Sequence, residues 1–405
     1  MRGFTEKRAS LYLYALFFGF LLLSGYGSLI MGFYWTVSEL GTRPELTDTT
    51  GQPAGRDFVA FWAASYMART GNPAAIYSLP QIHRVEEKII GTSTSPYAWN
   101  YPPVFLLMIL PLSLLPYLAS LIFWLLTTLT GYFLTIRSIV PNRLAPWIFL
   151  GFPVVTTNFF YGQNGFLSAT LMGSGLLLLD RYPFTGGLLL GLMSYKPQLA
   201  TLIPIALAVG GCWRALGGAV AAAVGAALAS LLVFGSGTWM AFWHNLSFAS
   251  GLMDKSIYWS KMPTVFAACR LAGASFPVAV AFQGASTLGI SAVVCWVWRC
   301  RPPLAMKASI LTVGIFLATP YAFECDLAVL GPAFAWLGWE EYSNGRLHGQ
   351  VFLICCWLGI DFAKFFPWRT VFQVNPLILL ALVLFILSRT GLLEKVKFTY
   401  GTARA

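Results

Sequence analysis

Charged side chains are scarce in this sequence. Asp, Glu, Lys and Arg make up only 10% of the 405 residues, whereas 57% are hydrophobic. Soluble globular proteins carry about a quarter charged residues, so this chain cannot bury its apolar surface in one soluble core and keep a polar exterior. Soluble, disordered, collagen-like and disulfide-stapled secreted classes are thereby excluded, and a polytopic membrane protein remains.

The sequence also lacks the alternation of apolar and polar residues that a transmembrane β-barrel requires. Its apolar residues form continuous runs instead, such as Leu176–Leu179 and Leu377–Leu380. The pattern therefore predicts an all-α fold, a polytopic transmembrane helical bundle that forms one integral membrane domain over residues 1–405.

Motifs for metals and nucleotides are missing as well. The chain has three histidines and seven cysteines, and no cysteine stands at metal-ligand spacing to a histidine. Most of these thiols are expected to be buried and apolar in character. The sequence contains no Walker motif, no GxGxxG after a strand and no DxD-like nucleotide-sugar signature. We therefore expect no cofactor, and an enzyme of this kind needs an activated substrate that stays in the bilayer.

The net charge of +11 comes from basic residues scattered singly between apolar runs. That distribution is typical of the positive-inside rule and not of nucleic-acid binding. Arg2, Lys7 and Arg8 precede the first run, so we expect a multi-pass protein of the cell membrane with cytoplasmic N- and C-termini. Two segments are then extracytoplasmic loops, 36–100 with interfacial helices and 237–263.

The apolar runs predict about twelve spans. Pro111 and Pro116 divide the second run, which indicates a re-entrant piece before a full crossing. The runs cover residues 11–35, 104–136, 146–161, 165–180, 184–195, 198–211, 215–235, 276–298, 304–319, 327–339, 350–366 and 374–388.

Unusual polar residues gather on the predicted outer face, where a buried ionisable or amide group is costly and indicates function. The first are Arg56 and Asp57, followed at helical spacing by Phe58, Phe61, Trp62 and Ser65. This spacing predicts a helix that lies on the outer leaflet. Asp57 is either the N-cap of that helix or a chemical group, and the two roles are compatible.

Amides mark two further junctions. Asn100 and Tyr101 precede two prolines that fix an extended entry into the next helix, and a simple helix start is the alternative reading. Gln163 and Asn164 stand between glycines, where they either line a polar site or satisfy local backbone groups.

Basic residues near this face can meet an anion. Lys196, followed by Pro197 and Gln198, either snorkels to the interface or points at a phosphate. Lys255 and Lys261 belong to the segment 237–263, which is either a lid over the site or a solvated loop.

Two carboxylates, Glu324 and Asp326, stand at the end of an apolar run and need a partner. Lys196, Lys255, Lys261 or a hydroxylated ligand can supply it. Together with Asp57 these carboxylates offer oxygen ligands for a metal. We expect no metal, because a phosphate can leave with lysine or amide help alone.

Seven short motifs, taken in order, resemble the family-87 glycosyltransferases of the GT-C superfamily over roughly residues 50 to 335. They are R-D-F-x-x-F-W-A-A, G-N-P-A-A-I-Y, N-Y-P-P-V-F, L-P-L-S-L-L-P, Y-G-Q-N-G, G-L-L-L-G-L-x-x-Y-K-P-Q and T-P-Y-A-F-E-C-D-L. The resemblance implies a membrane enzyme that takes a sugar from a polyprenyl-phosphate donor, as polyprenyl-phosphate-mannose-dependent mannosyltransferases do. The acceptor is then a lipid or a glycan.

The resemblance also implies roles for single residues. The family's acidic residue in the outer loop, interpreted as the general base, matches Asp57. One base and direct displacement predict inversion at the anomeric carbon. Lys196, Lys255 and Lys261 are expected to bind the donor phosphate. The expected sugar and acceptor contacts are Arg56, Asn100, Tyr101, Gln163, Asn164, Gln198, Glu324 and Asp326.

Two other functions fit the same inventory. A transporter or flippase of polyprenyl-linked sugar lipids would use the same amides but would need no base. A catalytically silent membrane scaffold would need neither.

Overall fold

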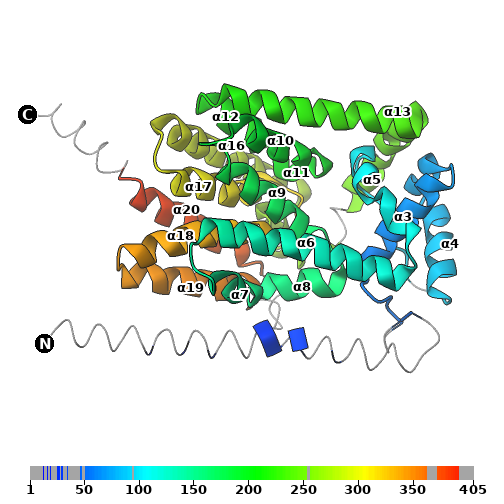
Figure 1. Cartoon of the computed structure of the whole chain (residues 1–405), viewed down its shortest axis with the longest axis horizontal. Coiled ribbons are helices and arrows are strands. Elements are labelled where there is room, and N and C mark those ends of the chain that lie inside the picture. The colour runs from blue at the N-terminus through cyan, green and yellow to red at the C-terminus, as the bar shows by residue number, and fades with distance from the viewer. Residues whose placement is uncertain are drawn as a thin grey trace, which may run out of the picture.

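The computed structural model describes residues 46–47, 51–93, 95–252, 256–362 and 372–391, with isolated positions between 12 and 34. Within these ranges the chain is helical, and its single β pairing is an isolated bridge between Thr47 and Pro53. The all-α prediction is therefore confirmed (Figure 1).

The helices follow one another with short connections, and six of the elements are single turns or short 3₁₀ helices. The first half comprises α3 (Phe58–Arg69), η2 (Pro73–Tyr77), α4 (Leu79–Ile90), α5 (Pro103–Ile109), η3 (Leu110–Leu114), α6 (Tyr117–Ile139), α7 (Ala145–Leu150), α8 (Pro153–Tyr161), α9 (Gly165–Leu177), α10 (Pro183–Leu192) and η4 (Met193–Tyr195). The second half comprises α11 (Pro197–Ala200), α12 (Leu202–Val209), α13 (Trp213–Leu252), α14 (Ser256–Trp259), α15 (Val265–Leu271), α16 (Phe276–Cys300), α17 (Leu304–Ala318), η5 (Glu324–Val329), α18 (Leu330–Ser343), α19 (Leu347–Phe362) and α20 (Asn375–Arg389).

Among the described residues, three helices are long and apolar enough to cross a membrane: α6, the stretch Trp213–Leu246 of α13, and α16. Several shorter apolar helices accompany them. On α13 and α16 large side chains remain exposed, with Leu232 at 85% and Leu288 at 75%, as expected for surfaces that meet lipid. The membrane character follows from these helices, whereas the number of about twelve spans and the orientation of the termini stay predictions.

The run 104–136 is divided as its prolines predict. α5 ends at Ile109, η3 contains Pro111, and α6 begins directly after Pro116, whose backbone is extended. Proline has no N–H to donate, so helical hydrogen bonding stops and restarts at these two positions. The single long crossing in this run is α6.

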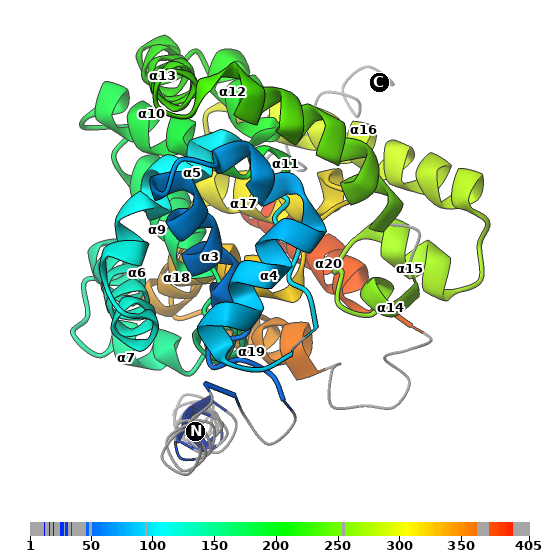
Figure 2. The same cartoon turned by 90° about the vertical axis from the view of Figure 1, so that its right-hand side faces the viewer.

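The apolar face of residues 58–65 is covered by protein, whereas the place of this helix at the outer leaflet stays a prediction. Phe58, Phe61 and Ser65 of α3 are 0%, 2% and 0% exposed, and α3 packs against α4, α5, η2 and η3. Figure 2 shows α3 and α4 next to each other at the face toward the viewer. This apolar face therefore contacts protein, because the aromatic rings that follow in the sequence cover it.

The segment 237–263 is not an irregular loop in its first half. α13 continues to Leu252, interrupted by non-helical backbone at Gly235 (φ 76°, ψ 166°). Beyond Gly235, α13 packs on η2 and α5, where the Phe242 ring lies 5.9 Å from the ring of Tyr77. The glycine lets one helix change direction there, since a positive φ strains other residues.

The core is held by close helix contacts. α17 is buried along most of its length between α16, α18 and α20. A Cβ atom on Gly187 or Gly191 of α10 would lie 2.0 or 2.2 Å from the carbonyl oxygen of Ala215 or Ala219 of α13. Small residues four apart let the two backbones touch, which is a common device where helices meet in a membrane.

Candidate functional site

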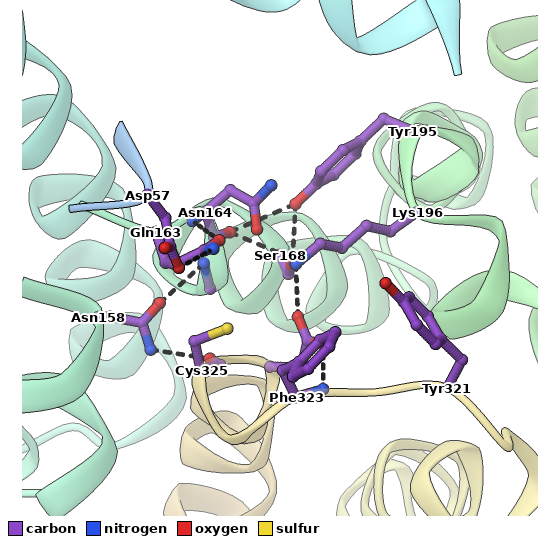
Figure 3. A network of polar contacts seen from close by, with 12 residues as sticks. Asp57, Asn158, Gln163, Asn164, Ser168, Tyr195, Lys196, Tyr321, Phe323 and Cys325 are labelled. Carbon is purple, nitrogen blue, oxygen red and sulfur yellow. Dashed lines mark hydrogen bonds and ion pairs between the residues drawn. The ribbon is translucent and has the colours of Figure 1, made fainter. Parts of the chain in front are cut away.

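Four segments that are distant in the sequence meet between the helices (Figure 3). They are the turn before α3, the α8–α9 junction, the η4–α11 junction and the start of η5. Hydrogen bonds link Asp57 through Gln163 and Asn164 to Tyr195, and the next residue, Lys196, pairs with Asp326. The fold thus gathers four motifs that the sequence displays separately.

Asp57 occupies the N-cap position of α3, but its side chain makes no capping hydrogen bond. Its Oδ2 atom accepts a hydrogen bond of 2.7 Å from Nε2 of Gln163 instead. No hydrogen bond from the described residues reaches Oδ1, and the residue is partly exposed. Capping by the side chain is therefore excluded here, and one carboxylate oxygen stays available for chemistry.

Burial raises the pKa of Asp57 above its ordinary value, because a charged carboxylate loses water there. The hydrogen bond from Gln163 opposes this rise, and so do the positive charges of Lys261, Arg56 and Lys196. The net shift is upward, in the direction that suits a group accepting a proton near neutral pH.

Glycines let the Asp57 turn and the Gln163 turn touch. Gly55 and Gly162 have φ values of 72° and 57°. A Cβ atom on Gly162 would lie 2.6 Å from Cβ of Phe58 and 3.0 Å from the carbonyl oxygen of Gly55. Arg56 also has a positive φ of 38°, which is uncommon outside glycine and marks backbone strain beside the carboxylate.

Arg56 itself turns toward α8. Its Nη1 atom donates a hydrogen bond of 3.2 Å to the hydroxyl of Tyr161, and its guanidinium lies 5.0 Å from the centre of that ring. The charge next to Asp57 is thereby held in place at the end of α8.

Asn158 belongs to the site although the sequence analysis missed it. This buried residue of α8 donates from Nδ2 to the carbonyl oxygen of Cys325 at 2.8 Å and accepts at Oδ1 from the N–H of Gly165 at 2.9 Å. A Cβ on Gly165 would lie 2.2 Å from Oδ1 of Asn158. One amide thus fastens the start of α9 to η5; the signal for it was an amide inside an apolar run.

Asn164 has an unsatisfied side chain. The residue is fully buried, and neither Oδ1 nor Nδ2 has a hydrogen-bond partner among the described residues. Its carbonyl oxygen is satisfied by the hydroxyls of Ser168 at 3.2 Å and Tyr195 at 3.3 Å. A buried polar group without a partner costs about 1–3 kcal/mol, so the Asn164 amide is an uncompensated polar group within this site.

Lys196 is buried, at 3% exposure, and its ammonium pairs with the equally buried carboxylate of Asp326. The second oxygen of Asp326 accepts from the N–H of Phe323 at 2.9 Å. The snorkelling interpretation of Lys196 is therefore wrong, since the side chain points into the protein. Asp326 has found its partner in Lys196, and the pair ties α11 to η5.

Lys261 is placed differently. It follows α14, its side chain is exposed, and its carbonyl oxygen accepts from the N–H of Glu324 at 3.0 Å. Three positive charges lower the pKa of Asp57, and that of Lys261 has a larger effect than those of Arg56 and Lys196. Within the described residues its ammonium has no ion-pair partner. Lys255 lies outside the described residues.

The remaining predicted residues lie at the edge of this network. Oδ1 of Asn100 accepts from Nδ2 of Asn245 at 3.3 Å, which directs it toward α13. The ring of Tyr101 lies 5.8 Å from the Lys196 ammonium. Gln198 lies in α11, and its side chain makes no hydrogen bond with the described part of the chain. In the described ranges, no three His, Cys, Asp or Glu side chains group closely enough to hold a metal ion.

Comparison with known proteins points to one family. The family model of glycosyltransferase family 87 matches residues 99–320, which is more than half of the chain. No curated protein and no solved structure matches the chain. The matched range contains Gln163, Asn164, Lys196 and Lys261, whereas Asp57 precedes it.

Proposed function

The chain belongs to glycosyltransferase family 87, and from that premise we propose that it transfers a sugar from a polyprenyl-phosphate donor to a lipid or glycan acceptor. The transferred sugar is a hexosyl residue, with mannosyl as the first candidate, or a pentosyl residue. The reaction takes place at the extracytoplasmic face of the cell membrane. A donor anchored in the bilayer suits a protein whose described part contains three long apolar helices with exposed apolar side chains.

One observation carries the proposal. Asp57 offers a carboxylate of which one oxygen is fixed by Gln163 and the other has no hydrogen bond within the described residues. A general base needs a free lone pair, a fixed orientation and a pKa raised toward the working pH, and Asp57 combines all three. A flippase that only moves the lipid forms no bond to the sugar, so it needs no base to take the acceptor proton.

The proposed step is a single displacement. The acceptor oxygen forms a bond to the anomeric carbon while the bond from that carbon to the phosphate oxygen breaks. The electron pair of the broken bond stays on the phosphate, and the acceptor proton passes to Asp57. The anomeric configuration is inverted, because there is one displacement and no glycosyl-enzyme intermediate.

Positive charge must meet the leaving phosphate. The ion pair with Asp326 neutralises Lys196, so we assign the phosphate to Lys261, whose ammonium is exposed and acts on Asp57. The side chain of Asn164, buried without a partner, is assigned to a hydroxyl of the sugar or acceptor.

The test uses purified protein in detergent with a synthetic short-chain polyprenyl-phosphate mannose and a lipid acceptor. Transfer is followed by mass spectrometry, and the Asp57→Asn variant is expected to lose about a hundred- to ten-thousand-fold in rate. Asp180→Asn is the matched control, because Asp180 is an exposed carboxylate at the end of α9, away from these contacts. Unchanged sugar transfer by the Asp57→Asn variant would disprove the assignment of Asp57 as the general base. Movement of the lipid across the membrane without sugar transfer would favour a flippase.

A further inference from the structure

The backbone around Lys261 is held at three consecutive carbonyl groups. Nε2 of Gln373 donates to the carbonyl oxygen of Ser260 at 3.2 Å and to that of Met262 at 3.0 Å. The carbonyl between them, that of Lys261, accepts from the N–H of Glu324 at 3.0 Å. One side-chain amide is therefore hydrogen-bonded to the backbone on both sides of Lys261.

Gln373 is itself fixed. It is 4% exposed, and its Oε1 accepts from the backbone N–H of Asn375 at 3.4 Å and from Nδ2 of Asn375 at 3.0 Å. Asn375 begins α20, which packs on α17 and α19. The Oε1 end of this amide is thereby fixed at the start of α20, which leaves Nε2 to face the segment that carries Lys261.

The short helix α14 covers four residues, Ser256–Trp259, and packs on α15, where the Trp259 ring lies 4.5 Å from the Arg270 guanidinium. A single turn of helix is unstable in isolation. Met262 is fully buried and adds an apolar anchor next to Lys261. Beyond the α14 turn, the Lys261 backbone is therefore held by Met262, Glu324 and Gln373, whereas its ammonium stays exposed.

We propose that Gln373 is a positioning residue that aims Lys261 at the phosphate group of the donor. This inference rests on the proposed function, because it takes Lys261 as the phosphate-binding cation. Lysine has a flexible four-carbon stem, so a fixed Cα reduces the volume that its charge explores and lowers the entropic cost of binding an anion. Gln373 lies outside residues 99–320, the range that matches the family model.

The experiment is a double-mutant cycle on the full-length protein. Binding of a short-chain polyprenyl monophosphate, and separately of inorganic phosphate, is measured by calorimetry for the parent, Lys261→Met, Gln373→Leu and the double variant. We expect Lys261→Met and Gln373→Leu each to weaken polyprenyl monophosphate binding, the latter about five- to tenfold through two lost hydrogen bonds. The double variant should bind no more weakly than Lys261→Met, because Gln373 acts only through Lys261.

A matched control is Gln283→Leu. Gln283 of α16 is also 4% exposed, and its amide likewise bridges two backbone segments, accepting from Phe266 at 3.0 Å and donating to Leu317 at 3.0 Å. Its effect, if any, should combine additively with that of Lys261→Met. Gln373→Glu serves as the second variant, because it preserves size and the Oε1 acceptor, removes the donor and adds a negative charge near Lys261, so it should weaken anion binding at least as much as Gln373→Leu. Thermal unfolding of every variant shows that it is folded.

Unchanged binding by folded Gln373→Leu and Gln373→Glu would overturn the proposal, and so would full additivity with Lys261→Met. Unchanged binding by Lys261→Met would also overturn the proposal, because Lys261 would then not bind the phosphate. Weaker binding of inorganic phosphate in parallel places the effect at the phosphate group, and a loss confined to the lipid contradicts the proposal. The binding assay needs no transfer, so failure of the proposed transferase activity is seen independently in the Asp57→Asn assay.

Discussion

Nε2 of Gln163 donates a hydrogen bond of 2.7 Å to Oδ2 of Asp57 across 106 residues of sequence. The sequence analysis assigned Gln163 to the substrate, whereas the structure places it on the carboxylate. The Oε1 atom of the same amide accepts from the N–H of Asn164 at 3.3 Å. Gln163 therefore holds Asp57 against the start of α9 and leaves the other carboxylate oxygen open.

We predict that Gln163→Leu changes the pH dependence of transfer. The hydrogen bond stabilises the charged carboxylate, so its loss raises the pKa of Asp57 further, while Lys261, Arg56 and Lys196 continue to lower it. Because the base acts only when deprotonated, the variant should lose about tenfold in rate on the acidic side and recover as the pH rises. The check is kcat against pH. Gln81→Leu, at an exposed position of α4, serves as the control; a profile for Gln163→Leu that parallels the parent at every pH would contradict the role.

We predict that Lys196→Met destabilises the protein. The variant leaves the carboxylate of Asp326 buried without its partner, and breaking a buried pair in this way costs about 3–5 kcal/mol. The double variant Lys196→Met with Asp326→Asn should regain most of that stability, because asparagine removes the charge and still accepts from the N–H of Phe323. Thermal unfolding in detergent measures both.

Lys88→Met is the control for this pair, since Lys88 is an exposed residue of α4. Equal unfolding temperatures for Lys196→Met and the parent would show that the pair has no structural role. Lys196 would then return as a candidate for the donor phosphate.

We predict a stability that depends on Glu86. Burial raises the pKa of Glu86 from its ordinary 4.5 to about 7, and the N–H of Tyr97 and the ring of His83 only partly oppose the rise. The folded state then binds more protons than the unfolded state, so stability falls as the pH rises from about 4.5 to about 7 and stays low above it. Glu86→Gln should remove this slope and increase the free energy of unfolding by about 3 kcal/mol at alkaline pH.

The measurement is chemical unfolding at a series of pH values. Glu87→Gln is the control, because the neighbouring Glu87 is partly exposed. A parent protein whose stability does not fall between acidic and neutral pH would disprove the prediction. The result bears on the site, since α4 packs directly on α3, which follows Asp57.

We predict that transfer survives treatment with a chelator. Charge on the leaving phosphate is met by Lys261 in the proposed step, so no divalent cation is required. Rates are compared with and without EDTA, and then with added manganese or magnesium. Loss of activity on chelation, followed by rescue with either metal, would replace this view with a metal-assisted mechanism.

Much of the fold could be predicted from the sequence. Continuous apolar runs exclude alternating strands, so the all-α architecture follows from the residue pattern alone. Pro111 and Pro116 likewise fix where one run divides, because proline cannot donate a backbone hydrogen bond. The apolar face of α3 was assigned to lipid, however, since local periodicity cannot distinguish a bilayer from a ring cluster such as Phe61 with Trp99 and Trp124.

The candidate site was predictable in its parts and not in its connections. Asp57, Gln163, Lys196 and Asp326 each stand out because polar groups in apolar surroundings are costly. Which of them pair is decided by close approach of backbones, as at Gly162 and Gly55. No local signal reveals that approach.

The sequence by itself determined that this chain is a helical membrane protein of glycosyltransferase family 87 character, because composition and motif order are local properties. Only the tertiary structure decided that Lys196 is neutralised by Asp326, that Asn158 fastens α9 to η5, and that Gln373 holds the backbone of Lys261. The contacts from Lys196 to Asp326, from Asn158 to Cys325 and from Gln373 to Met262 each join residues more than 100 positions apart. Their partners are set by helix packing, which the order of residues along one segment does not specify.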